Sequence, residues 1–126
     1  MPEGKILIVD DKPALRRCFK ELCEANGYRA DCASNGEEAL RCIETGAYDL
    51  LIVDYRMPVM NGLEFVQKIR ANESDIPIIA MSSCDLEHLF ITAGADLFLR
   101  KPFGPDILEK KIKSFCSISS GLQKRI

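Results

Sequence analysis

Three apolar runs constrain the fold of this chain more than any other feature of its sequence. They lie at residues 5–9, 50–53 and 76–81 and contain almost no polar side chain. Short runs of this kind are typical of strands that are buried on both faces, as happens when helices cover both sides of a parallel sheet. The runs therefore predict a doubly wound α/β sandwich with right-handed crossovers.

The rest of the chain alternates strand and helix patterns. Strands are predicted at 5–10, 29–33, 50–54, 76–82 and 96–100. Between them lie helical patterns that begin near Pro13, Asn35, Asn61, Leu86 and Leu108, and Gly27, Gly46 and Gly94 are expected to end the first, second and fourth. The spacing of Leu15, Cys18, Phe19, Leu22 and Cys23 predicts one apolar face on the first helix. The pattern is (βα)₅.

Acidic residues follow two of the predicted strands. Asp10 and Asp11 come directly after the first apolar run, and Asp54 comes directly after the second. Because parallel strands end at one edge of the sheet, where such folds bind ligands, these carboxylates should share one pocket. Three carboxylates repel one another, and oxygen ligands of this kind suit a hard divalent cation such as Mg²⁺.

Ser82 and Lys101 stand at the same edge, because they follow the fourth and fifth strands. A carboxylate can accept a phosphoryl group when a metal ion and an ammonium neutralise the transferring oxygens and a hydroxyl hydrogen-bonds the product. We therefore predict that Asp54 is the nucleophile and that Lys101 pairs with the phosphoryl charge. Asp11 and Asp54 would hold Mg²⁺, and Asp10 would act through a bound water.

Composition narrows the classes of function. The 126 residues suit a single domain, predicted over 4–117, with an unstructured tail at 118–126. The net charge of -2 gives no support for direct nucleic-acid binding, and no apolar stretch is long enough for membrane insertion. The six cysteines lack zinc-site spacing and are expected to be thiols that mostly face inward, in a cytoplasmic protein.

These residues together resemble the receiver domain of bacterial two-component response regulators, over about residues 4–117. The resemblance rests on Asp10-Asp11, on the segment Asp54-Tyr55-Arg56-Met57-Pro58-Val59-Met60-Asn61-Gly62, on Pro77 with Ser82, and on Lys101-Pro102-Phe103. It implies a flavodoxin-like sheet, and we expect the strand order 2-1-3-4-5. It also implies a histidine kinase or histidine phosphotransfer protein as phosphodonor, the backbone carbonyl of Arg56 as a metal ligand, and a cis peptide before Pro102.

The resemblance implies a switch as well. Ser82 would move toward the phosphoryl group, and Phe98 would rotate inward. Arg56 and Cys84 occupy positions that flank the path of attacking water in that family, and we hypothesise that they set the phosphate lifetime. From Ser82 to Lys101 the chain is roughly three residues shorter than we expect for the family, which is nearly one helical turn, so the fourth helix should be short.

Other interpretations compete with this one. Asp10 or Asp11 alone could cap the first helix, Lys101 alone could be a surface charge, and a solvent-facing Arg56 is about as credible as a shielding one. His88, the only histidine, is expected to be an ordinary surface residue. A hydrolase with an aspartyl-phosphate intermediate would need an aspartate where Arg56 stands, so no separate enzymatic activity is expected. A phosphate-independent interaction module remains the alternative, and the output partner is unknown.

Overall fold

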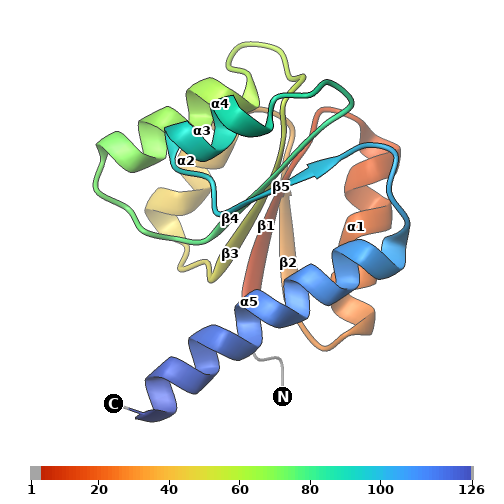
Figure 1. The fold of residues 1–126 in the computed structure, drawn as a ribbon, viewed down its shortest axis with the longest axis vertical. Coiled ribbons are helices and arrows are strands. Elements are labelled where there is room, and N and C mark those ends of the chain that lie inside the picture. The colour runs from red at the N-terminus through yellow and green to blue at the C-terminus, as the bar shows by residue number, and fades with distance from the viewer. Residues whose placement is uncertain (1–3, 126) are drawn as a thin grey trace.

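A computed structural model describes the backbone of residues 4–125 and the side chains of residues 4–115. The elements alternate throughout (Figure 1). The strands are β1 (Lys5–Val9), β2 (Arg29–Ala33), β3 (Leu50–Asp54), β4 (Ile78–Ser82) and β5 (Leu97–Arg100). The helices are α1 (Pro13–Ala25), α2 (Gly36–Thr45), α3 (Gly62–Ala71), α4 (Glu87–Ala93) and α5 (Pro105–Arg125). The predicted (βα)₅ order is confirmed.

All described strands pair in parallel in the order β2-β1-β3-β4-β5, as expected. Asp54 is in register with Met81 on β4, which places the end of β3 beside Ser82. Strand β4 begins at Ile78, two residues later than predicted, because Pro77 has no N–H to donate to a neighbouring strand. β1 ends at Val9 and β5 begins at Leu97, each one residue inside the predicted bounds.

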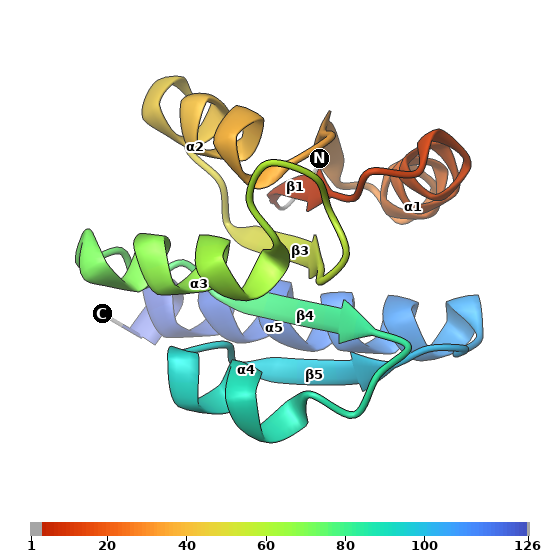
Figure 2. The same ribbon diagram turned by 90° about the horizontal axis from the view of Figure 1, so that it is seen from above.

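Helices cover both faces of the sheet (Figures 1 and 2). On one face α1 and α5 pack against strand residues such as Ile8 and Ile52, and on the other α2, α3 and α4 pack against residues such as Val9 and Val53. Strand residues 6–9, 50–53 and 78–81 are completely buried. Burial of both faces explains why these strands read as continuous apolar runs rather than alternating ones.

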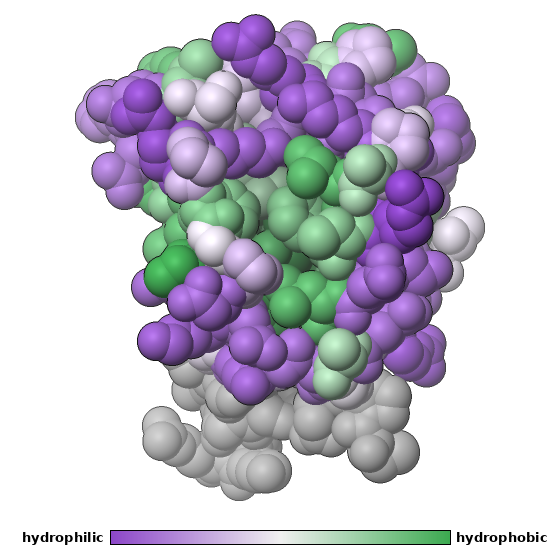
Figure 3. Space-filling view, turned by 90° about the vertical axis from the view of Figure 1, so that its right-hand side faces the viewer, coloured by the Kyte–Doolittle hydropathy of each residue, from purple (hydrophilic) through white to green (hydrophobic). Residues whose placement is uncertain are grey.

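Half-buried apolar residues close the α1 and α5 side toward solvent. They include Leu15 and Leu22 on α1 and Phe103 after β5, whose ring stacks on that of Phe19 with centroids 6.5 Å apart. Apolar surface is accordingly visible between polar side chains on the side of the molecule seen in Figure 3. Cys18 differs from its prediction: it is exposed, because it lies at the margin of the apolar stripe rather than within it.

Local sequence explains where the helices begin. Asn35 caps α2, because its side chain accepts a hydrogen bond from the N–H of Glu38 at 2.8 Å. Asn61 and Glu64 form a reciprocal capping box at the start of α3, with bonds of 2.9 and 3.1 Å. These caps fix the helix starts, and the box fixes the end of the loop that follows Asp54.

The last two helices bear on the sequence predictions. Helix α4 has only seven residues, which confirms that it is short, and His88 is exposed on it. Helix α5 runs to Arg125, so the backbone of 118–125 differs from the unstructured tail that was expected. No proline follows Pro105 to stop the helix, and each added residue extends an existing hydrogen-bond pattern. Ile126, the last residue of the predicted tail, lies outside the described residues.

Candidate functional site

Three carboxylates meet at the carboxyl edge of the sheet, as predicted. Asp10, Asp11 and Asp54 each offer an oxygen within 4.8 Å of the others. Asp10 is fully buried and Asp54 is 3% exposed. Asp10 Oδ2 and Asp11 Oδ1 are buried without a hydrogen-bond partner. Buried carboxylate oxygens without partners are costly, and they are the donor atoms that a hard cation takes.

The Asp10 carboxyl is held from its own loop. The N–H of Lys12 donates to Asp10 Oδ1 at 3.0 Å, and the guanidinium of Arg16 donates to the Asp10 carbonyl oxygen at 2.7 Å. Burial raises the pKa of Asp10, and the charges of Asp54 and Asp11 raise it further, although the Lys12 bond and the Lys101 charge lower it. In the absence of a cation, the site therefore disfavours the ionised form of Asp10.

Lys101 supplies positive charge at the cluster. Its Nζ donates to Asp54 Oδ1 at 2.7 Å and lies 3.8 Å from Asp10 Oδ2, which is an ion pair but too long for a hydrogen bond. The N–H of Lys101 donates to the carbonyl of Ser82 at 2.8 Å, so the end of β5 is tied to the end of β4. The predicted cis peptide between Lys101 and Pro102 is present.

The loop after β3 closes tightly under Asp54. The N–H of Arg56 donates to Asp54 Oδ2 at 3.1 Å, and the N–H of Gly62 donates to the Tyr55 carbonyl at 2.9 Å. A side chain at Gly62 would collide with the backbone carbonyl oxygen of Asp54. Glycine is therefore required at this position by the close approach of two backbones.

A pocket opens beside Asp54 and contains the predicted serine. It is lined by Lys12, Asp54, Arg56, Ser82, Ser83 and Lys101. Ser82 is 2% exposed, and its Oγ accepts a hydrogen bond from the N–H of Cys84 at 3.0 Å. Its own proton is then available to a group held in the pocket. The structure thus brings together all five residues that were expected at one edge: Asp10, Asp11, Asp54, Ser82 and Lys101.

The side chains of Arg56 and Cys84 form a hydrogen bond with each other at the rim of the pocket. The Arg56 Nη2 donates to Cys84 Sγ at 3.3 Å, from an otherwise exposed side chain. This hydrogen bond, aided by the positive charge, lowers the pKa of the Cys84 thiol. The two residues therefore bridge the β3–α3 and β4–α4 loops at the rim of the pocket. Sequence reasoning placed both residues near the site but did not foresee their contact.

Phe98 lies behind the pocket rather than in it. It is 9% exposed and stacks on Phe90 of α4, with ring centroids 5.7 Å apart. Tyr55, which follows Asp54, contacts the same Phe90 ring edge-on, with ring centroids 6.1 Å apart. An aromatic row therefore leads from the phosphoacceptor candidate to α4 and β5.

The residues present fit a divalent cation of the magnesium type. They supply carboxylate oxygens from Asp10, Asp11 and Asp54, and two of these oxygens, Asp10 Oδ2 and Asp11 Oδ1, accept no hydrogen bond in the described structure. None of the described cysteines, which are Cys18, Cys23, Cys32, Cys42 and Cys84, joins this cluster. An all-oxygen set favours Mg²⁺ over softer metals.

None of the helices in the described part of the chain has the length and apolar character needed to span a bilayer.

Comparison with known proteins identifies the family. Residues 6–113 match the response regulator receiver domain. The chain is 40% identical over 112 residues to the probable transcriptional regulator ycf27 of Cyanidium caldarium, covering 86% of this chain and 45% of that protein. It is 34% identical over 113 residues to the alkaline phosphatase synthesis transcriptional regulatory protein PhoP of Bacillus subtilis, covering 87% and 47%. The chain thus spans about half the length of these curated relatives.

Comparison with solved structures supports the same family. The receiver domain of Francisella response regulator 1452 superposes with a TM-score of 0.89 at 28% identity, covering 92% of this chain and 98% of that one. The response regulator TrrA of Thermotoga maritima, solved in complex with Mg²⁺ and BeF, superposes with a TM-score of 0.81 at 39% identity, covering 91% and 99%. The fold, the site and these matches lead to one conclusion: the chain belongs to the response regulator receiver domain family of two-component systems.

Proposed function

We propose that this chain is a magnesium-dependent phosphoacceptor switch that is phosphorylated on Asp54. The observation that carries the proposal is the convergence on Asp54 of two acidic neighbours, the Lys101 ammonium and the Ser82 hydroxyl in one pocket. The relative TrrA, which binds Mg²⁺ and BeF in its solved structure, supports it. The donor is a histidine kinase or a histidine phosphotransfer protein.

The reaction is a transfer of a phosphoryl group between two proteins. An oxygen of Asp54 attacks the phosphorus of a phosphohistidine, the new O–P bond forms as the P–N bond breaks, and the bonding electrons leave with the donor imidazole. Lys101, already 2.7 Å from Asp54, stays paired with the charge of the transferred group. Ser82 donates its hydroxyl proton to a phosphoryl oxygen while its Oγ continues to accept from the N–H of Cys84.

Asp11, Asp54 and the backbone carbonyl of Arg56 would hold the Mg²⁺ ion directly, and Asp10 would hold it through a water. When bound, the ion supplies positive charge that offsets the developing charge on the phosphoryl oxygens. Asp10 and Asp11 are suited to this role because each has a buried oxygen that accepts no hydrogen bond in the described structure. Lys12 and Arg16 position Asp10 for it through the bonds described above.

The switch consists of Ser82 and Phe98. Ser82 moves toward the phosphoryl group, and the loop that begins at Ser83 follows it. Phe98 has no hydroxyl, so its outward and inward positions differ in packing against Phe90 and not in a hydrogen bond. Phosphorylation shifts the population between two surface states, and an output protein reads the difference.

Arg56 and Cys84 set the lifetime of the acyl phosphate. Arg56 lies at the pocket rim, where its guanidinium can leave Cys84 for the more strongly charged phosphoryl oxygens. There it would shield the phosphorus from water. Arg56→Ala should then speed loss of the phosphoryl group in the presence of Mg²⁺, and an unchanged rate of loss would contradict this role.

The chain acts through partners and catalyses no reaction on a separate substrate. Apart from its own phosphorylation and dephosphorylation, its activity is recognition by the phosphodonor and by an output protein, in the cytoplasm. The two curated relatives described above are named as transcriptional regulators, and this chain matches less than half of their length. Direct contact with nucleic acid is not part of the proposed role of residues 4–117.

The test is the mass of the intact protein after incubation with acetyl phosphate and Mg²⁺. We expect one added phosphoryl group in the wild-type protein and in Asp75→Asn, which removes an exposed carboxylate away from the pocket. Asp54→Asn, and wild type with a chelator, should gain none. If folded, magnesium-loaded protein gains no phosphoryl group and binds no beryllofluoride, the chain is a phosphate-independent interaction module instead.

A further inference from the structure

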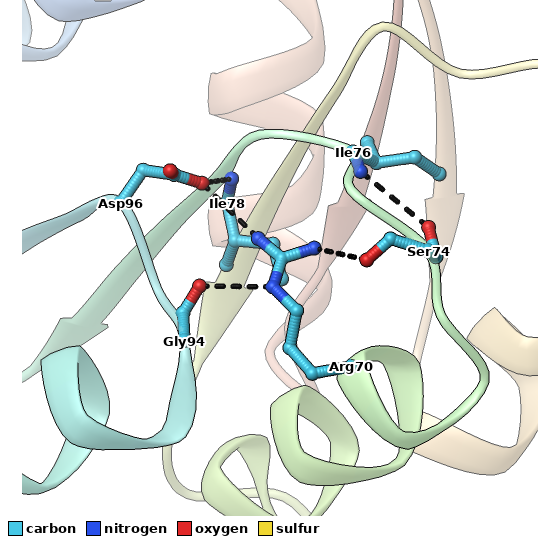
Figure 4. A network of polar contacts seen from close by, with 6 residues as sticks. All are labelled: Arg70, Ser74, Ile76, Ile78, Gly94 and Asp96. Carbon is cyan, nitrogen blue, oxygen red and sulfur yellow. Dashed lines mark hydrogen bonds and ion pairs between the residues drawn. The ribbon is translucent and has the colours of Figure 1, made fainter.

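A single arginine at the edge of the sheet opposite the pocket joins several elements. Arg70, in the last turn of α3, donates from Nε to the Gly94 carbonyl at 2.9 Å and from Nη1 to the Ser74 carbonyl at 2.8 Å. Its Nη2 donates to Asp96 Oδ2 at 3.1 Å. Figure 4 shows the guanidinium between these acceptors. One side chain thereby ties α3 to the turn that ends α4.

Asp96 extends this network into the sheet. Its Oδ2 also accepts a hydrogen bond from the N–H of Ile78, the first residue of β4, at 2.8 Å. The N–H of Asp96 in turn donates to the Ile78 carbonyl at 2.9 Å. We call Arg70, Ser74, Ile78, Gly94 and Asp96 the Arg70 clamp (Figure 4). The planar guanidinium of Arg70 bonds to two backbone carbonyls and a carboxylate in a fixed fork. It therefore restrains both the direction and the distance of the α4 end relative to α3.

Gly94 makes the carboxyl end of α4 fit this clamp. Its φ of 115° requires glycine, and a Cβ there would lie 2.6 Å from Cγ of Arg70. The N–H groups of Gly94 and Ala95 both donate to the carbonyl of Phe90, at 3.1 and 2.9 Å. The end of α4 is therefore held by its own cap and by Arg70 together.

The amino end of α4 is held much more weakly. Its N-cap residue, Leu86, makes no side-chain capping bond. The preceding loop is fastened by two exposed arginine side chains: Arg56 Nη2 donates to Cys84 Sγ at 3.3 Å, and Arg100 Nε donates to the Ser83 carbonyl at 3.0 Å. A further bond, from the Cys84 N–H to Ser82 Oγ at 3.0 Å, joins the loop to the residue proposed to move. Ser83 and Cys84 follow Ser82 directly, so this weak end is the one that begins at the pocket.

We propose that the Arg70 clamp is a fixed pivot for α4. This role rests on the proposed phosphorylation of Asp54. A displacement that begins at Ser82 moves residues 83–90 and stops at Gly94. The helix then swings on its carboxyl end instead of shifting as a whole. Arg70 is thus a positioning residue for the response, and it touches neither Asp54 nor the residues around it.

The pivot determines which surface changes. Leu89 and Ile91 are 49% and 45% exposed on this short helix. At about 1.5 Å of rise per residue, Leu89 lies about 7.5 Å along the helix from Gly94 and Ile91 about 4.5 Å. A swing about Gly94 therefore displaces Leu89 more than Ile91.

The experiment compares amide hydrogen exchange of the full chain with and without Mg²⁺ and beryllofluoride. In wild type we expect exchange to change several-fold over residues 83–90 and to stay the same over 94–96. In Arg70→Met, which keeps an unbranched stem but loses the hydrogen bonds, the change should spread to 94–96. Lys68→Met removes a cation from the same helical turn without touching the clamp, and it should behave as wild type.

Three results would overturn the pivot: an equal change over 83–90 and 94–96 in wild type, no change over 83–90 in wild type that has bound beryllofluoride, or a wild-type pattern in Arg70→Met. If Arg70→Met does not fold, Arg70→Lys replaces it, since a single ammonium cannot bond to the Gly94 carbonyl, the Ser74 carbonyl and Asp96 Oδ2 in the fixed fork that the guanidinium makes. Fluorine NMR of bound beryllofluoride separates the two hypotheses. Absence of binding refutes the proposed function, whereas binding with unchanged exchange over 83–90 refutes the pivot alone.

Discussion

Replacing Asp10 with asparagine should stabilise the metal-free protein, although it damages the site. The amide oxygen can still accept the 3.0 Å bond from the Lys12 N–H. The amide nitrogen would replace Asp10 Oδ2, the buried oxygen that has no hydrogen-bond partner, and could donate to a neighbouring carboxylate. The change removes one negative charge from a place where it is buried and repelled.

The charges give the magnitude. At an effective dielectric constant of about 20, carboxylate oxygens that lie within 4.8 Å of one another repel by at least about 3 kcal/mol, and an ammonium at 3.8 Å attracts by about 4 kcal/mol. Asp10 faces two such repulsions, from Asp11 and Asp54, and one attraction, from Lys101. Asp11 is partly solvated, which weakens its share, and burial of the Asp10 charge adds a cost. We expect a net gain of about 2 kcal/mol for Asp10→Asn.

The assay is urea denaturation near neutral pH in the presence of a chelator, followed by circular dichroism. A gain of about 2 kcal/mol should raise the midpoint by about 1 M urea at an ordinary denaturant slope. Asp75→Asn, which removes an exposed charge outside the cluster, is the control and should leave the midpoint nearly unchanged. With Mg²⁺ at about 100 times its dissociation constant, wild type should gain about 2.7 kcal/mol and the variant less.

A lower midpoint for Asp10→Asn than for wild type in chelator would refute the electrostatic reasoning. Equal stabilisation of both proteins by Mg²⁺ would refute the assignment of Asp10 to the metal site. These outcomes are independent, because the first concerns the charge without the ion and the second concerns the ion itself.

Three further predictions concern stability. The folded pKa of Asp10 is raised above its ordinary value of 3.8, so the folded state keeps a proton that the unfolded chain releases, and this contribution to stability is lost as pH rises through the raised pKa. In chelator, wild type should therefore lose stability relative to Asp10→Asn as pH rises above about 4, and a constant difference would contradict this. Gly62→Ala should cost about 2–3 kcal/mol in urea denaturation and lower the yield of phosphorylated protein, because the new methyl group meets the Asp54 carbonyl; wild-type stability would show that the loop can yield. Asn61→Ala removes the α3 cap and should lower the free energy of unfolding by about 1 kcal/mol. Phosphoryl transfer to Asp54 should persist, as the intact mass would show. Loss of transfer in folded protein would mean that the cap also shapes the site.

The site could be predicted from sequence because each of its residues lies at or just beyond a strand end. Asp10, Asp54, Ser82 and Lys101 all stand where an apolar strand stops, and parallel pairing brings those ends to one edge. The length of each strand then fixes the place of the functional side chain. The chemical type of these residues and their places at the strand ends therefore predicted the same site independently.

Other features were out of reach because they depend on the paths of long side chains. Arg70 reads as an ordinary solvated cation on a helix, yet it bonds to Gly94, 24 residues further along the chain. Arg56 was placed near the pocket by its position after Asp54, but nothing in the sequence indicates that its guanidinium selects Cys84. Cys18 fits a helical stripe by spacing, and only the packing of α1 shows that it lies outside the buried part.

The place of α5 in the chain has a consequence for synthesis on the ribosome. Leu108 and Ile112 of α5 belong to the same apolar cluster as Ile8 and Ile52 of the central strands. Translation delivers these helical residues after strands β1 to β5 have been made. A nascent chain that has paired its strands must therefore leave part of one face of the sheet exposed to water until α5 packs on it. Chaperones that bind apolar surface should bind the protein there.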